Sequence, residues 1–179
     1  MQHLNHLSKS QQESVLALIK AAHDFDGTPP IAEHVLLHLR HGGDKSDSHL
    51  VIEENKEVIA YAHLDTTDLV AGPSVEAVVH PSHRGKGLGS LILKEAIKVC
   101  GDKTRIWSHG DLPAAKSIAA SLKLERLWSN LLMSKSLGEI QPVTSKYPIR
   151  TFIPDFDNQA SNTNRNCPAP VQHHLRNFK

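Results

Sequence analysis

A chain of 179 residues, 39% of them hydrophobic and 22% charged, has the balance of one globular domain of ordinary size with some chain left over. Its formal net charge of +1 argues against nucleic-acid binding driven by bulk electrostatics. It has no signal-peptide core, and no apolar run approaches the roughly 18 residues of a membrane span, so we expect a cytoplasmic protein without a membrane partner.

The first part of the chain predicts two helices. Residues 10–13, Ser-Gln-Gln-Glu, have the form of a capping box at the start of the first helix. Its apolar stripe consists of Val15, Leu16, Leu18, Ile19 and Ala22. Residues 26–30 break this pattern. The second helix is predicted over residues 31–40, after two prolines and before two glycines.

Strands and helices then alternate along the chain. Short apolar runs bounded by turn residues predict five strands, over residues 50–52, 58–62, 75–80, 106–109 and 127–133. The first two flank a polar turn and predict a β-hairpin. Two further helices are predicted over residues 88–100 and 113–122. This order indicates an α/β protein, with helices packed on a mixed sheet.

The pattern fades toward the end of the chain. We expect one domain over residues 1–140 and a linker over residues 141–157. Residues 158–179 are polar, contain prolines and show no apolar period. Such a composition cannot bury enough apolar surface to offset the entropy lost on ordering, so we expect a disordered tail there.

The thirteen histidines raise the question of a metal site. His34 and His38 stand four apart in the second predicted helix, so both imidazoles could lie on one face, with Glu33 close by. A zinc site also needs a third ligand and carboxylates that orient the histidines, and nothing in the sequence places them. We therefore expect solvent-exposed histidines and no metal. The two cysteines, Cys100 and Cys167, form neither a disulfide framework nor a zinc site.

The most informative segment is a glycine-rich run between a predicted strand and a predicted helix. Gly85-Lys-Gly-Leu-Gly89 has neither the Gly-Lys-Ser/Thr of a Walker A loop nor the G-x-G-x-x-G spacing of a dinucleotide fingerprint. What remains is R-x-x-G-x-G, which begins at Arg84. Backbone N–H groups that no side chain covers, together with the helix dipole, favour an anion there. A tight turn alone explains only one glycine, so we predict a pyrophosphate site with Arg84 and Lys86 at its rim.

These residues resemble a known family. Val78-Val79-His80-Pro81 followed by R-x-x-G-x-G resembles the acetyl-CoA-binding motif of the GNAT superfamily of N-acetyltransferases, and the predicted order of elements is that of its fold. The segments DGTPPIAEHVL, EAVVHPSHRGKGLG, IWSHGDLPAAKSIAASLKL and YPIRTF further resemble the N-terminal half of the mycothiol synthase family. That family acetylates a cysteinyl–glucosamine–inositol amine. The resemblance spans residues 11–152 and implies a single GNAT-like domain, with a mixed, mostly antiparallel sheet flanked by helices.

The resemblance also implies which residues bind acetyl-CoA. Ala77, Val78 and Val79 would line the acetyl group and the pantetheine arm through their backbone. The pyrophosphate would lie on the loop and the first helical turn, formed by Arg84, Gly85, Lys86, Gly87, Leu88, Gly89 and Ser90. Glu33 matches a glutamate that contacts the acceptor in the family. A glutamate in the first turn of a helix is also stabilised by the helix dipole, and both interpretations remain open.

In acetyl transfer to an amine, a base removes the proton of the amine and a hydrogen-bond donor stabilises the thioester oxyanion. The leaving thiolate also benefits from a proton. Glu76, acting through water, and His109 are the two candidate bases, and a backbone N–H near Val79 is the candidate oxyanion donor. Members of the superfamily often use a tyrosine as the acid. Here Ser121 stands in that place, and the two tyrosines lie elsewhere in the order of elements. A thiolate can leave without an acid, because the pKa of a thiol is only about 8.5.

Two functions remain open. One is an acetyl-CoA-dependent N-acetyltransferase of the mycothiol synthase type that acts on a small-molecule amine. The other is a non-catalytic acetyl-CoA-binding module from a truncated tandem-domain protein, because that family has two such domains and R-x-x-G-x-G occurs once here. A separate catalytic domain or a second copy of the chain would then be its partner. A nucleotide-phosphate binder unrelated to acetyl transfer would require the loop spacing to be a coincidence.

Overall fold

The computed structural model describes residues 1–41, 47–131, 133, 134, 136, 138 and 146. Its contacts divide the chain into two units, Met1–Ser129 and Asn130–Lys179, and the fold below is that of the first unit. The predicted tail, residues 158–179, and all of the predicted linker except residue 146 lie outside the described residues, so both stay predictions. In the part of the chain that is described, no helix has the length and the apolar character needed to cross a membrane.

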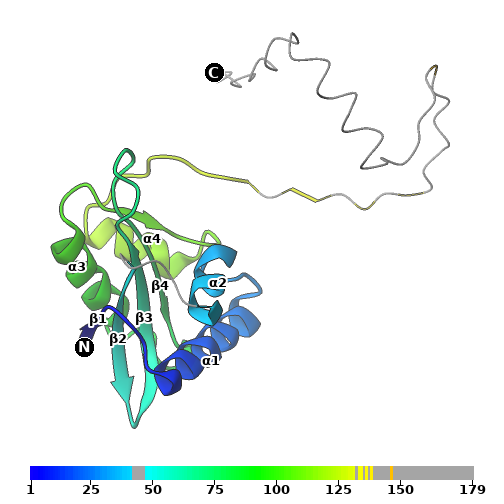
Figure 1. Ribbon diagram of the computed structural model, residues 1–179. Coiled ribbons are helices and arrows are strands. Elements are labelled where there is room, and N and C mark those ends of the chain that lie inside the picture. The colour runs from blue at the N-terminus through cyan, green and yellow to red at the C-terminus, as the bar shows by residue number, and fades with distance from the viewer. Residues whose placement is uncertain (42–46, 132, 135, 137, 139–145, 147–179) are drawn as a thin grey trace, which may run out of the picture. The chain divides into compact units, whose positions relative to one another are not determined.

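The described residues form one five-stranded sheet flanked by helices (Figure 1). The strands lie side by side in chain order: β1 (Gln2–Leu4), β2 (Ser48–Glu54), β3 (Glu57–Asp65), β4 (Ser74–Val79) and β5 (Arg105–Trp107). The first four are antiparallel, and β5 is parallel to β4. The helices are α1 (Lys9–Asp26), α2 (Glu33–His41), α3 (Leu88–Cys100) and α4 (Pro113–Ser121), and a 3₁₀ turn, Pro81–His83, follows β4. The predicted α/β class, with a mixed and mostly antiparallel sheet, is confirmed.

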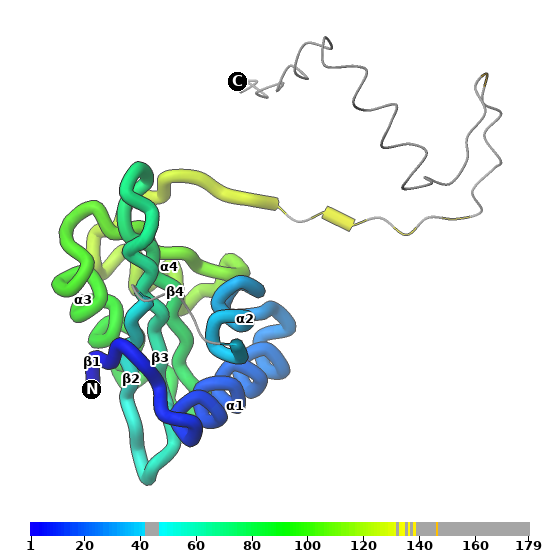
Figure 2. Tube along the Cα trace, in the orientation of Figure 1, coloured from blue at the N-terminus to red at the C-terminus, as the bar shows by residue number. Residues whose placement is uncertain are grey.

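The sheet separates two cores. Figure 2 traces the chain with α1 and α2 on one side of the sheet and α3 on the other. Successive side chains of a strand face opposite sides, so Tyr61 of β3 packs with the residues of α1 and α2, whereas Leu64 packs with those of α3. His49, His63 and Glu76 are buried polar side chains at directly paired positions of β2, β3 and β4. Side chains at paired positions share a face, so all three lie beneath α1 and α2 with Tyr61.

The first helix begins earlier than the sequence predicts. The capping box is at Ser8, whose hydroxyl accepts a hydrogen bond from the Gln11 N–H at 3.2 Å, while the Gln11 side chain accepts one from the Ser8 N–H at 3.1 Å. The prediction of Ser10 as the cap is therefore wrong. Two overlapping boxes occur in the sequence, and Leu7, which packs against the core, fixes the chain at the earlier one. The apolar stripe is confirmed, because Val15, Leu18, Ile19 and Ala22 are buried.

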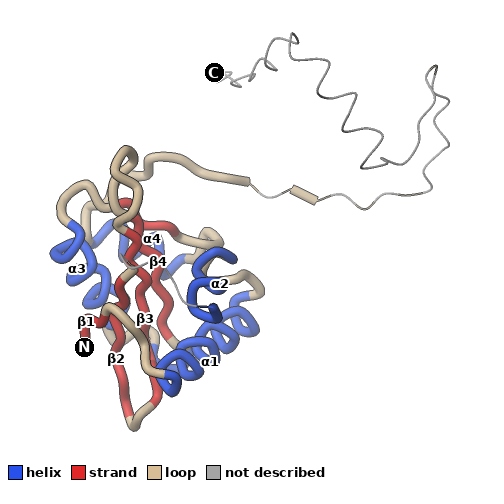
Figure 3. The backbone as a smooth tube through the Cα atoms, viewed as in Figure 1, coloured by secondary structure: helices blue, strands red, loops and turns tan. Residues whose placement is uncertain are grey.

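The two edges of the sheet also differ from prediction. Figure 3 draws the described residues after α4 as loop, so the strand predicted over residues 127–133 is wrong for those of its residues that are described. Leu127 and Leu131 are exposed, and Trp128 packs edge-on against Trp107, with ring centroids 5.6 Å apart. An apolar run without a neighbouring strand gives no ladder. The sequence analysis missed β1, because three residues are too short for an alternating pattern.

Candidate active site

β4 extends beyond its parallel partner β5. The two strands pair from Ser74 to Glu76 on β4 and from Arg105 to Trp107 on β5. β4 continues through residues 77–79, where its ladder partner is β3. Along residues 77–79, the edge of β4 that faces away from β3 therefore has no partner strand among the described residues. The family resemblance implies that the acetyl group and the pantetheine arm bind along this edge, and this stays a prediction.

The backbone groups on this edge alternate in direction. The His80 N–H donates to the Ile59 carbonyl at 2.9 Å, so these two residues form a hydrogen-bonded pair of the antiparallel ladder. Counting back in steps of two, Val78 also bonds to β3, whereas the N–H groups of Ala77 and Val79 point away from β3. The Val79 N–H therefore points to the edge of β4 that β5 does not cover. This is the direction that the candidate oxyanion donor needs.

The three glycines of the loop have different structural roles. Gly85 and Gly87 have φ angles of +75° and +81°, in the left-handed region that glycine adopts without strain. A Cβ on either would meet no heavy atom of the described residues within 4 Å, so the space beside them is open. Gly89 lies in α3, where a Cβ would come within 2.8 Å of Cδ1 of Ile118. Gly89 thus lets α3 pack against α4, while the other two leave the loop surface uncovered.

The N-terminus of α3 presents free backbone donors. Gly87 is its N-cap residue, and no side chain of the described residues caps it. The N–H groups of Leu88, Gly89 and Ser90 have no acceptor within the helix, and the positive end of the helix dipole lies with them. Lys86 is exposed beside them. This combination of open glycines, free N–H groups and a cation favours an anion such as a pyrophosphate.

Arg84 is held against α1. Two of its guanidinium nitrogens each donate to one carboxylate oxygen of Asp26 at 2.7 Å, and its Nε donates to the Val79 carbonyl at 3.1 Å. The guanidinium also lies 5.5 Å from the ring centroid of Phe25. These contacts join the end of α1, the end of β4 and the start of the glycine loop. A direct contact between Arg84 and a pyrophosphate stays a prediction, and Lys86 is the exposed cation of the loop.

The two candidate bases, Glu76 and His109, contact each other. Nε2 of His109 lies 3.1 Å from Oε2 of Glu76, and the same oxygen accepts a hydrogen bond from the Ala32 N–H at 2.6 Å. Burial raises the pKa of Glu76, but the hydrogen bonds from His109 and Ala32 outweigh it and hold that pKa below its ordinary value. Glu76 is therefore ionised at neutral pH. The His109 side chain is 27% exposed, so it can reach a bound molecule, whereas that of Glu76 is 6% exposed.

A carboxylate only accepts hydrogen bonds, so its contact with His109 fixes the proton of the imidazole. Nε2 of His109 carries the hydrogen that Glu76 accepts. In the neutral ring, Nδ1 is then the atom that can take up a proton. Glu76 thus orients the imidazole and leaves Nδ1 of His109 as the candidate proton acceptor of the pair, and the role of either residue as a base stays a prediction.

The start of α2 adjoins this pair. Ala32, whose N–H binds Glu76, directly precedes Glu33, the exposed first residue of α2. On the other side, a Cβ on Gly110 would lie 3.3 Å from Cγ2 of Thr28, so the loop after β5 packs against the loop before α2. Glu33 is therefore close in the chain to a group that touches the Glu76–His109 pair. Its contact with an acceptor stays a prediction.

Ser121 occupies the position at which members of the superfamily often have a tyrosine acid. The Ser121 hydroxyl donates to the Ile118 carbonyl of its own helix at 2.9 Å. Tyr61 is fully buried, its hydroxyl lies 2.9 Å from Nδ1 of His49, and burial raises its pKa further. Tyr147 lies outside the described residues. The hydroxyls of Ser121 and Tyr61 thus both have hydrogen-bond partners within the protein.

Sequence reasoning missed the partners of the site residues. Asp26 and Ala32 were assigned no role, and each meets its partner across a separation of more than forty residues. The contact between Glu76 and His109 was not predicted either. The alternation of β4 did carry a signal, because it puts Glu76 on the same face as Val78, which packs in the core beneath α1 and α2.

Comparison with known proteins identifies the family of the chain. Residues 14–123 match the model of the Acetyltransferase (GNAT) family. A mycothiol acetyltransferase of Acidothermus cellulolyticus is 41% identical over 152 residues, which cover 82% of this chain and 46% of the relative. One of Streptosporangium roseum is 34% identical over 176 residues, which cover 97% and 52%. The chain thus spans about half the length of these curated relatives.

Solved structures show the same fold. A GCN5-related N-acetyltransferase from Sphaerobacter thermophilus matches with a TM-score of 0.52 and 21% identity, over 65% of this chain and 41% of that one. A ribosomal-protein-alanine N-acetyltransferase from Brucella melitensis matches with a TM-score of 0.51 and 17% identity, over 68% and 83%. The fold, the glycine loop and the family match lead to one assignment. The chain belongs to the GNAT family of acetyltransferases, whose acetyl donor is acetyl-CoA.

Proposed function

We propose that the chain is an acetyl-CoA-dependent N-acetyltransferase of the mycothiol synthase type, acting on the amine of a cysteinyl–glucosamine–inositol acceptor. The observation that carries this proposal is the Glu76–His109 pair, a hydrogen-bonded carboxylate and imidazole beside the end of the β4–β5 ladder. A binding module needs the glycine loop but has no use for an oriented base. The acceptor follows from the similarity to the relatives named mycothiol acetyltransferase.

The donor would be held by backbone groups. Its pyrophosphate would accept hydrogen bonds from the N–H groups of Leu88, Gly89 and Ser90 at the start of α3, with Lys86 adding positive charge. Gly85 and Gly87 would let the phosphates approach the loop, since the space beside them is open. The pantetheine arm would then extend along residues 77–79 of β4, toward Glu76.

Transfer would proceed by direct attack of the amine on the thioester carbonyl. The new bond joins nitrogen to the acetyl carbon, and the bond from that carbon to sulfur breaks. The N–H of Val79 is the proposed donor to the oxyanion that forms in between. The leaving group would depart as a thiolate, which its low pKa of about 8.5 allows without an acid. This is consistent with a Ser121 hydroxyl that is bonded within its own helix.

Nδ1 of His109 would take the proton that the amine loses. Glu76 would hold the imidazole in the required tautomer and would stabilise the imidazolium once it forms. The same carboxylate binds the Ala32 N–H, so the base and the start of α2 are held together. Glu33, the next residue, is proposed to contact the acceptor. A substrate bound there would have its amine close to His109.

The test is the rate of CoA release by purified protein with acetyl-CoA and the acceptor. Replacing the base in His109→Gln should lower kcat by about 10²–10⁴-fold, the usual cost of losing a general base. The affinity for acetyl-CoA should not change, because His109 lies outside the glycine loop. His41→Gln, an exposed histidine at the end of α2, is the matched control and should keep the wild-type rate. A His109→Gln variant with the wild-type kcat would overturn the role of this base.

A further inference from the structure

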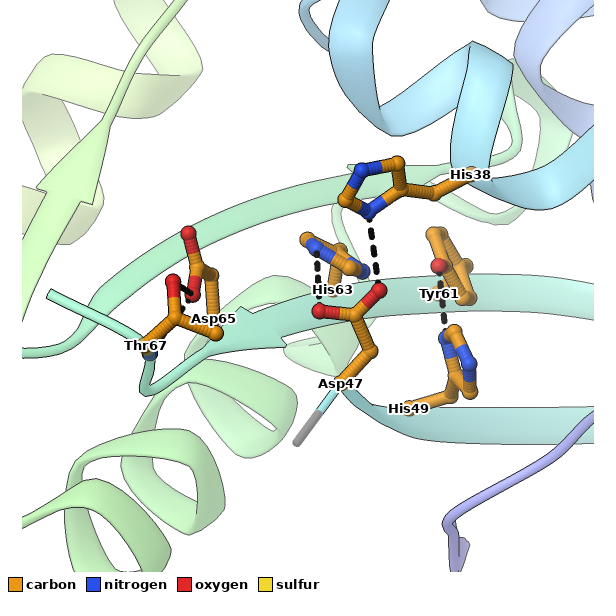
Figure 4. Close-up of polar contacts among 7 residues, drawn as sticks. All are labelled: His38, Asp47, His49, Tyr61, His63, Asp65 and Thr67. Carbon is orange, nitrogen blue, oxygen red and sulfur yellow. Dashed lines mark hydrogen bonds and ion pairs between the residues drawn. The ribbon is translucent and has the colours of Figure 1, made fainter. Parts of the chain in front are cut away.

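A second polar cluster lies beneath α2, away from the glycine loop. It consists of His38 on α2, Asp47 just before β2, and His63 on β3, as Figure 4 shows. Nδ1 of His38 lies 2.8 Å from one oxygen of Asp47, and Nε2 of His63 lies 4.0 Å from the other. Each of the three residues offers one ligand atom, and these atoms lie within 4.8 Å of one another. Residues from α2, from the chain just before β2 and from β3 thus bring two imidazoles and a carboxylate together.

His63 is the feature that calls for an explanation. It is 2% exposed, and neither of its ring nitrogens has a hydrogen-bond partner among the residues that the structure describes. Leaving a buried donor or acceptor unsatisfied costs about 1–3 kcal/mol, and a neutral imidazole has one of each. Its neighbours on the sheet do not relieve this cost, since His49 bonds to Tyr61 and Glu76 bonds to Ala32 and His109. His63 is therefore a buried side chain whose Nε2 faces the Asp47 carboxylate at 4.0 Å and makes no hydrogen bond with the described residues.

The ligand set selects a class of metal. Two imidazoles and one carboxylate suit divalent transition metals such as Zn²⁺, whereas Mg²⁺ and Ca²⁺ prefer oxygen ligands throughout. With metal–ligand bonds of about 2.0–2.2 Å, tetrahedral geometry separates neighbouring ligand atoms by roughly 3.3–3.6 Å. The three ligand atoms of the cluster lie within 4.8 Å of one another, which is wider than this range. Binding would therefore draw the three side chains closer together.

The cluster also has a route to solvent. The His38 side chain is 33% exposed, whereas those of Asp47 and His63 are each 3% exposed. His38 lines a pocket of about 310 Å³ together with His6, Gln12 and His49. An ion could reach the cluster past the partly exposed His38, and a water molecule could fill the coordination position left by the three protein ligands.

We propose that His38, Asp47 and His63 form a binding site for one divalent transition-metal ion, of which Zn²⁺ is the representative. A bound ion would link the second half of α2 to the sheet through β3 and the start of β2. The start of α2 is already linked to the sheet, because the Ala32 N–H binds Glu76, and Glu76 is the direct cross-strand neighbour of His63. The ion would therefore fix both ends of the helix that begins with Glu33. Its role is to position α2, and it takes no part in the chemistry of acetyl transfer.

The test is a titration of Zn²⁺ into the full chain after removal of metals by a chelator, followed by calorimetry. We expect one high-affinity ion per chain, no comparable binding of Mg²⁺, and a rise in melting temperature with Zn²⁺. Co²⁺ should give the visible absorption of a tetrahedral site. His38→Ala changes a partly exposed side chain, and Asp47→Asn keeps the shape of the carboxylate. Each should weaken Zn²⁺ binding by roughly 100-fold or more, since even indirect partners of a metal site contribute 10–100-fold.

His34→Ala is the matched control. His34 is exposed on the same helix, one turn before His38, and its ring centroid lies 6.2 Å from that of His38. We expect its affinity for Zn²⁺ and its Zn²⁺-dependent rise in melting temperature to equal those of the wild type. An equal loss in His34→Ala and His38→Ala would overturn the proposal in favour of a surface pair on α2. Unchanged binding in a folded Asp47→Asn variant, or no stoichiometric binding by the wild type, would also overturn it. These readouts do not depend on acetyl transfer.

Discussion

The ion pair between Asp26 and Arg84 should hold α1 to the glycine loop, and Asp26→Asn tests this. The Asp26 side chain is 8% exposed. Its two oxygens each accept a hydrogen bond of 2.7 Å from one terminal nitrogen of the Arg84 guanidinium. Asparagine has nearly the same shape but no charge and only one acceptor oxygen. The substitution therefore leaves a partly buried guanidinium with half of its bidentate contact.

The magnitude follows from the exposure of the two partners. Breaking a fully buried ion pair by removing one partner costs about 3–5 kcal/mol. The Arg84 side chain is 27% exposed, so solvent screens part of its charge, and the asparagine keeps one hydrogen bond. We therefore expect a loss of about 2 kcal/mol in the free energy of unfolding, and for a protein of this size a fall of about 4–8 °C in melting temperature.

The assay is urea denaturation of the wild type, Asp26→Asn and the control Asp24→Asn. Asp24 lies in the same last turn of α1 and pairs with Lys20, but the side chains of that pair are 56% and 74% exposed. Removing either carboxylate relieves the same unfavourable interaction with the helix C-terminus. The control should therefore change the free energy of unfolding by less than about 0.5 kcal/mol. If Asp26→Asn loses no more stability than Asp24→Asn, the reasoning about this pair is refuted.

Three other predictions concern the site. Folding holds the pKa of Glu76 below its ordinary value of 4.5. The ionised carboxylate therefore stabilises the fold above pH 4.5, and this contribution is lost as the pH falls from 4.5 through the lower pKa of the folded state. Urea midpoints from pH 6 to pH 3 should therefore fall less steeply for Glu76→Gln, and parallel profiles would contradict this. Ser121→Ala should leave kcat for CoA release unchanged, and a large fall would restore Ser121 as a candidate acid. Gly87→Ala should cost about 1–2 kcal/mol of backbone strain at φ +81°, by thermal denaturation. Gly89→Ala should cost less, because only the end of the Ile118 side chain must move, and the opposite order would contradict these assignments.

Local signals in the sequence were enough to predict the elements that carry the donor site. The helix predicted over residues 88–100 is α3, and the glycines before it lie at its N-terminus as expected. The predicted hairpin also forms, since β2 and β3 pair across the turn at Asn55 and Lys56. Each of these features depends on neighbours in the chain: apolar spacing, turn residues and a helix start. Such features are the ones that a single sequence determines.

The contacts that give the site its chemistry depend on neighbours in space. His109 meets Glu76 only because β5 pairs in parallel with β4. The register that aligns Trp107 with Glu76 cannot be predicted from the sequence of either strand alone. His38 and His63 come together in the same way, through the packing of α2 on β3. The sequence analysis considered His34 as the partner of His38, which the helical period suggests, whereas the structure brings Asp47 and His63 to it.

Turnover by the single chain is the most direct test of the proposed function. Purified wild-type protein would be mixed with acetyl-CoA and the cysteinyl–glucosamine–inositol acceptor, and free CoA thiol would be followed with time, while calorimetry measures acetyl-CoA binding separately. We predict CoA release that requires both substrates and is proportional to the amount of protein. A protein that binds acetyl-CoA but releases CoA no faster than the mixture without protein would contradict the account, and would identify the chain as a binding module.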